Sequence, residues 1–141
     1  MDLTVNNPDF RGKVEVADGG FLYVNSQLNN VVASEQDPVW VHGTGSILGI
    51  YGSQVNNRFR PDGWGLISDG GQFYYRGVNP CGQSNSPSLI VSNGTIKVEM
   101  VSGSHLHLKN LRFYGNSEVF ITGNAAAYAN EGLNIFGTVT V

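Results

Sequence analysis

Short runs of alternating apolar and polar residues recur along the whole chain, and they are rich in β-branched and aromatic side chains. This two-residue period is typical of β-strands with one buried face. Gly, Asn, Asp and Ser separate the runs, as turns require. Only residues 124–130, before Gly132, have the composition of a short helix. The sequence therefore predicts an all-β chain with strands at 14–16, 21–24, 39–41, 47–51, 64–67, 72–75, 88–91, 95–101, 105–108, 111–114, 118–121, 133–136 and 138–141.

The stretch 104–117 changes the phase of its alternation once. Its apolar residues lie at even positions up to Leu108 and at odd positions from Leu111 onward, with Lys109 and Asn110 between them. A strand that bends without reversing shows such a slip, because the inward side changes at the bend. Asn enters the left-handed backbone region more readily than most residues. We therefore predict a corner at residues 109 and 110, with Asn110 left-handed.

Corners of this kind distinguish two all-β folds. In an antiparallel β-sandwich or jelly roll, tight turns reverse the chain and each strand keeps its alternation up to the turn. In a parallel solenoid, the chain bends without reversing. Internal similarity also favours the rungs of a solenoid, since residues 18–23 resemble 69–74 and residues 45–50 resemble 103–108. We expect a solenoid-like coil, with the β-sandwich or jelly roll as the alternative.

The run NGTIKVEMVSGSHLHLKNLRFYGNSEVFITGN, residues 93–124, resembles the rungs of right-handed parallel β-helices of the pectate-lyase type. Bacteriophage tail spikes also use this fold. The resemblance concerns corner chemistry and carries no catalytic motif. It implies a single domain over residues 14–141 that forms a short right-handed parallel β-helix. Residues 54–65 and 76–87 fit this pattern poorly, so they are expected to be loops outside the coil.

The first thirteen residues, 1–13, place Leu3, Val5 and Phe10 among polar residues and a proline. Such a segment cannot bury these side chains by itself, so it must lie on another surface. We predict an extended N-terminal arm that docks on a neighbouring subunit. The alternative is an edge strand of the same domain.

Charge is sparse in this chain. Charged residues make up 13% of the 141 residues, against about 25% in typical soluble domains, and the net charge is -3. The basic residues are scattered, so we expect no nucleic-acid partner. No apolar run is long enough to span a membrane, and the opening residues resemble neither a signal peptide nor an anchor. With Cys81 as the one cysteine, no intrachain disulfide is expected, so packing or assembly should stabilise the domain.

The acidic residues show no catalytic pattern. Polysaccharide-cleaving β-helices need paired carboxylates, or a carboxylate with a basic partner, across a groove. Here most acidic residues fall in turns or point outward on predicted strands, and Asp18 and Asp69 precede Gly-Gly, where Asp forms turns. No nucleophile-elbow, Walker or zinc-protease motif occurs. We predict that the protein is not an enzyme.

His105 and His107 form an H-x-H motif on a predicted strand, so their side chains should share one face. The motif resembles that of trimeric phage fibres and membrane-piercing spikes, where it binds iron on the trimer axis. That resemblance implies an axial metal ion held by His105 and His107 from three chains. The alternative is a pair of solvated histidines. His42 is expected in a turn.

Two clusters combine aromatic and cationic residues and could act as an interface anchor or a sugar-stacking platform. Three consecutive aromatic residues must place at least one side chain on the outer face of a strand. Trp64 could instead plug the end of the core. The candidates are Arg58, Arg60, Trp64, Phe73, Tyr74 and Tyr75.

Taken with the resemblance, these features predict a non-enzymatic structural component of a phage particle, located in the virion. The two versions of this role are a capsid decoration or cement protein and a short tail spike or fibre. The expected partners are its own subunits, in a homotrimer, other capsid or tail proteins, and a host surface glycan. The alternative function is a carbohydrate-binding module or receptor-binding domain that uses exposed aromatic side chains.

Overall fold

The computed structural model describes residues 2–3, 13–24, 35–36, 38–52, 64–77, 88–100, 105–122 and 126–141. Within these ranges all regular structure is β-strand, which confirms the all-β prediction. The strands are β1 (Asp2–Leu3), β2 (Glu15–Val16), β3 (Phe21–Val24), β4 (Val39–His42), β5 (Ile47–Gly52), β6 (Trp64–Ser68), β7 (Gln72–Gly77), β8 (Ser88–Ser92), β9 (Thr95–Met100), β10 (His105–Thr122) and β11 (Ala126–Thr140).

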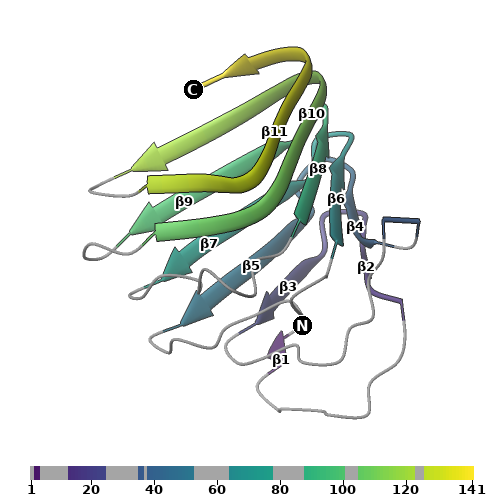
Figure 1. Ribbon diagram of the computed structural model, residues 1–141. Helices are drawn as coiled ribbons and strands as arrows, with labels where there is room; N and C mark the ends of the chain where they lie inside the picture. The colour runs from purple at the N-terminus through teal and green to yellow at the C-terminus, as the bar shows by residue number, and fades with distance from the viewer. Residues whose placement is uncertain are drawn as a thin grey trace.

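The strands form a parallel β-solenoid. Every pairing among the described strands is parallel. Even-numbered strands from β2 to β8 stack on one face and odd-numbered strands from β1 to β9 on another, and β10 joins both faces. The chain climbs from β1 and β2 to β11, so the two termini lie at opposite ends of the coil (Figure 1). The solenoid prediction is therefore confirmed, and the antiparallel alternative is wrong.

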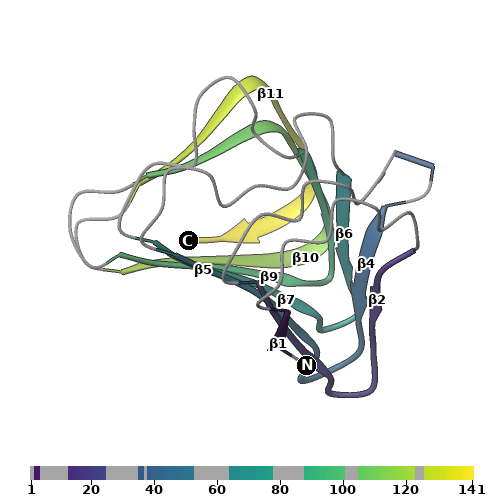
Figure 2. The same ribbon diagram turned by 90° about the horizontal axis from the view of Figure 1, so that it is seen from below.

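The core consists of apolar side chains stacked in columns along the coil. In one column each residue pairs with its equivalent on the next turn, and all five are buried: Val16, Val41, Ile67, Val91 and Phe113. A second buried column runs along the other face of the coil and consists of Leu22, Leu48, Phe73 and Ile96. Seen along the coil, the long strands β10 and β11 bend around this core (Figure 2).

Left-handed residues mark the corner between the two faces. Asp18, Asp69 and Asn93 each have φ of 52°, and each lies two residues after a member of the first core column. Gly115 holds the same position on β10, with φ of 62°. Backbone bonds join successive corners, as Gly70 N–H donates to the Asn93 carbonyl at 2.7 Å. The predicted turns at residues 18–20, 69–71 and 92–94 are thus solenoid corners.

Of the predicted corner at residues 109 and 110, only the left-handed conformation of Asn110 is wrong, because β10 does bend between its first residues and the part that pairs with β8 (Figure 2). The phase slip is real, since Leu106, Leu108, Leu111 and Phe113 are all buried. Among the described residues, however, only Asp18, Asp69 and Asn93 are non-glycine residues with positive φ. The backbone at Asn110 stays outside the left-handed region, and the pairing of β10 with β11 instead shifts register between Leu108 and Asn110. A strand irregularity therefore changes the inward side without a left-handed residue.

Two other sequence expectations fail where strand pairing decides the outcome. The predicted helix is wrong, because residues 126–130 belong to β11, where Ala127 pairs with Leu106. Pairing along β10 overrides the helix preference of the alanines. The similarity of residues 45–50 to 103–108 also has no structural counterpart, because Leu48 pairs with Leu22 and Phe73 on a different face.

Replacing Asn93 by valine should destabilise the solenoid by roughly 2–3 kcal/mol. A β-branched residue resists the left-handed conformation, and valine also removes the bond from Asn116 N–H to the Asn93 side-chain oxygen, which is 3.0 Å long. Asn93→Gly should cost about 1 kcal/mol, since it removes only the bond. Urea unfolding followed by circular dichroism measures both. Asn110→Val is the control, and equal damage from Asn93→Val and Asn110→Val would contradict the corner assignment.

Candidate functional site

The C-terminal end of the coil leaves core positions uncovered. Leu133 and Ile135 pair with the buried Leu111 and Phe113 and so continue the core columns, yet they are 57% and 53% exposed. Ile121, which continues a core column of the other face, is 40% exposed. Within the described residues β11 pairs only with β10. Apolar side chains and the free edge of a long strand therefore form one surface, which is called the open end below.

Aromatic side chains also line the outer surface of the last two turns. Tyr114 and Phe136 lie on neighbouring turns with their ring centres 5.0 Å apart and an interplanar angle of 14°. Phe120 is 47% exposed on the outer side of β10. Exposed apolar area concentrated in this way is a common feature of contact surfaces.

Of the predicted aromatic and cationic candidates, two are core residues. Phe73 and Tyr75 point inward from β7 and are 0% and 4% exposed. The interface or sugar-stacking role is therefore wrong for these two side chains, because neither presents a ring face to a ligand. Tyr74 points outward, so one of the three consecutive aromatic side chains lies on the outer face, as the pattern predicted. Arg58 and Arg60 lie outside the described residues.

Tyr74 is held on the outer face by charged neighbours. Its hydroxyl donates a hydrogen bond to the Glu99 carboxylate on β9, and the Lys97 ammonium lies 5.4 Å from the centre of its ring. The pKa of Glu99 lies below its usual value, chiefly because of the hydrogen bond from Tyr74. Burial raises this pKa, and the positive charges of Arg76 and Lys97 lower it by smaller amounts. The Tyr74 side chain is thereby fixed in place.

Trp64 is half-buried on β6 and makes an internal contact. The Arg112 guanidinium of β10 lies 5.0 Å from the centre of its ring, and the same guanidinium pairs with the Glu35 carboxylate. Residues 35 and 36 thus lie over the outer face of the even-numbered strands. Among the described residues, Trp64 is therefore linked to Glu35 through Arg112.

Of the two predicted metal ligands, His105 and His107, the structure describes only the side chain of His107. His105 begins β10, and its side chain lies outside the described residues. The His107 imidazole is 7% exposed and stacks on Tyr128 of β11, with the ring centres 4.9 Å apart. In the described part of the chain, no group of three His, Cys, Asp or Glu residues could hold a metal ion. The axial metal site stays a prediction.

The N-terminal arm, residues 1–13, is described only at residues 2, 3 and 13. Residues 2 and 3 form β1, which pairs with β3 at the end of the sheet and places Leu3 beside Val24. At these positions the chain lies on its own domain as an edge strand. Val5 and Phe10 lie outside the described residues, as does Cys81.

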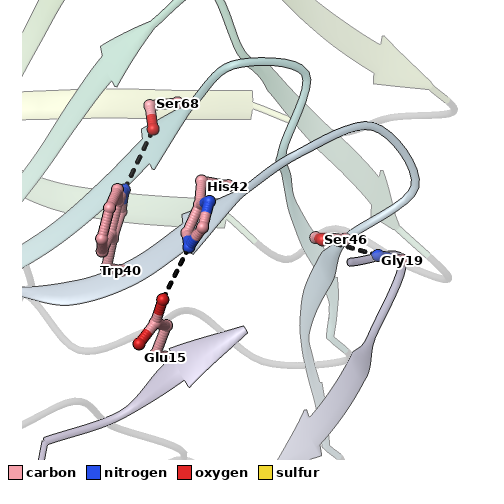
Figure 3. A network of polar contacts seen from close by, with 6 residues as sticks. All are labelled: Glu15, Gly19, Trp40, His42, Ser46 and Ser68. Carbon is pink, nitrogen blue, oxygen red and sulfur yellow. Dashed lines mark hydrogen bonds and ion pairs between the residues drawn. The ribbon is translucent and has the colours of Figure 1, made fainter. Parts of the chain in front are cut away.

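A polar network on the outer face of β2, β4 and β6 was missed by sequence reasoning (Figure 3). The Trp40 indole N–H donates to the Ser68 hydroxyl at 3.0 Å, and the Trp40 ring stacks on His42 with the ring centres 3.9 Å apart. The His42 imidazole in turn contacts the Glu15 carboxylate at 2.8 Å. His42 is the last residue of β4, so the prediction that it lies in a turn is wrong. The alternation of VWV, with two buried valines, points to an outward Trp40 and was the available signal.

Comparison of the chain with known protein families, with curated proteins and with solved structures found no match. None of the described residues belongs to a helix that is long and apolar enough to cross a membrane. The candidate surfaces are therefore the open end, the outer aromatic residues and the Trp40 network, each known from its geometry alone.

Proposed function

We propose that this protein is a non-enzymatic structural component of a phage particle and that it works as a homotrimer. The observation that carries the proposal is the open end, where Leu133 and Ile135 continue the core columns but are more than half exposed. Burying such a side chain is worth about 1.5–3 kcal/mol. Contact with other subunits would recover this free energy and would also cover the free edge of β11.

Symmetry favours a closed assembly over an open one. An end that stacks repeatedly on the opposite end of the next copy would build a fibre of undefined length, whereas rotation about one axis closes after a fixed number of copies. We propose three copies, with their β11 strands meeting near the axis. The choice of three and the assignment to a virion rest on the resemblance of residues 93–124 to phage spike rungs.

The sparse charge supports an assembled state. With 13% charged residues, the chain has few like charges to keep neighbouring copies apart. Both versions of the role, decoration or cement protein and tail spike or fibre, need a stable shape with contact surfaces. The solenoid would supply such a shape. Other capsid or tail proteins are the further partners that we propose.

Light scattering on the full chain should give three times the chain mass over a wide range of concentration. Mass spectrometry of purified particles from the source that encodes the chain should detect the protein, and labelled antibody should mark the particle surface. A monomer at high concentration would overturn the assembly role. A trimer that is absent from particles would overturn the virion assignment but leave the assembly role intact.

A further inference from the structure

A hollow of about 380 Å³ lies on the outer face of the solenoid beside Trp40, whose strand β4 is separated from β11 by β6, β8 and β10. Trp40 and Leu66 lie on neighbouring strands and Pro38 precedes β4. Val14 adds a further apolar side chain, and the polar residues that line the hollow are Lys13, Glu15 and Gln36. Small-ligand sites in proteins have this size and this mixture of apolar walls with a few polar groups.

From this arrangement we propose that the Trp40 hollow binds a neutral sugar ring, such as a hexopyranose. The proposal goes beyond the assembly role and does not depend on it. One face of a pyranose ring carries C–H groups that pack on an aromatic ring, while its hydroxyl groups need donors and acceptors at the edge. Trp40 supplies the aromatic surface, and the polar side chains of the hollow supply the hydrogen-bonding groups.

The Trp40 indole is fixed before any ligand arrives. Its N–H is bonded to Ser68, and His42 stacks against the ring and is itself held by Glu15 (Figure 3). The side chain nevertheless stays 38% exposed. A ring held in this way loses little rotamer freedom on binding, so more of the stacking energy remains as affinity. An exposed tryptophan on a strand is also unusual, because this side chain is normally highly buried.

The polar groups of the hollow suit hydroxyl groups better than a charged ligand. Lys13 offers N–H donors, Glu15 offers carboxylate oxygens, and the Gln36 amide offers both kinds of group. The opposite charges of Lys13 and Glu15 largely cancel, so the hollow has no strong preference for an anion or a cation. A single aromatic ring beside a lysine also differs from the aromatic cages that bind quaternary ammonium groups.

Nuclear magnetic resonance on the full chain tests the proposal. The chain has two tryptophans, so the indole N–H region should show two signals, which Trp40→Phe and Trp64→Phe assign. Titration with the methyl glycosides of glucose, galactose, mannose and N-acetylglucosamine, up to tens of millimolar, should move the Trp40 signal to saturation for at least one sugar. The Trp64 signal should move much less.

Variants separate stacking from a general surface effect. Trp40→Ala should weaken binding at least tenfold, measured on the signals of the sugar because this variant lacks the Trp40 indole. Gln36→Ala, which leaves the ring network intact, should weaken binding several-fold. Tyr114→Ala removes an aromatic side chain of similar exposure, 36%, outside the hollow and should leave binding unchanged. Circular dichroism confirms that each variant is folded.

Several results would overturn the sugar site. In one, no sugar of the panel moves the Trp40 signal. In another, binding to Tyr114→Ala falls as far as binding to Gln36→Ala. A third is saturable binding of a proline-rich peptide or of tetramethylammonium, with none of any sugar, which would assign the hollow to that other ligand class. Light scattering of Trp40→Ala keeps this test apart from the assembly role, because loss of sugar binding should leave the oligomeric state unchanged.

Discussion

Phe73→Ala should lower the free energy of unfolding by about 3–5 kcal/mol, the range for buried phenylalanines. Phe73 is 0% exposed on β7 and pairs with Leu48 of the turn below and Ile96 of the turn above, which are 0% and 1% exposed. Its removal would open a cavity in the middle of a core column. Neighbouring side chains have little freedom to fill the cavity, because the parallel backbone pairing fixes the spacing between turns.

Urea unfolding followed by circular dichroism measures the effect of Phe73→Ala. Phe21→Ala is a matched control, since it makes the same chemical change on β3 at a side chain that is 47% exposed. This control should cost less than about 1 kcal/mol. Similar losses from the two variants would contradict the inward orientation of Phe73 and, with it, the register of β7.

The architecture could be predicted from local sequence because a solenoid repeats one local rule. Alternation assigned the inward side chains of most strands, and Asp before Gly-Gly marked the corners at Asp18 and Asp69. Both signals are contained in a few consecutive residues. The phase slip in β10 could also be predicted, because a change of inward side alters the spacing of the apolar residues along the sequence.

Features that depend on strand register could not be predicted in this way. Three consecutive aromatic residues on β7 fit either parity, and only the pairing of Phe73 with Ile96 decides that Tyr74 points outward. The helix preference of residues 126–130 was local, whereas the β10 partner that overrides it is distant in sequence. Likewise, Trp40 contacts Ser68 and His42 contacts Glu15 across neighbouring turns. The residue pattern of one turn alone does not reveal such contacts.

Lysines at the open end should separate the subunits of the homotrimer that we propose. In the double variant Leu133→Lys with Ile135→Lys, two ammonium groups replace apolar side chains that continue the core columns. Burying them against another subunit without partners costs several kcal/mol, so we expect the dissociation constant to rise at least about 100-fold. Both side chains are more than half exposed in the single chain, so its circular dichroism spectrum should stay unchanged.

The matched control shifts the same charges by one residue, as Asn134→Lys with Phe136→Lys. These side chains alternate with Leu133 and Ile135 on β11 and belong to the outer surface of the coil. Light scattering should therefore give the trimer mass for the control and the monomer mass for the Leu133 and Ile135 variant. The reverse result would mean that subunits associate side by side through the outer aromatic residues. Trimer mass for both variants would place the interface elsewhere, since lysines buried on either side of β11 would have separated the subunits.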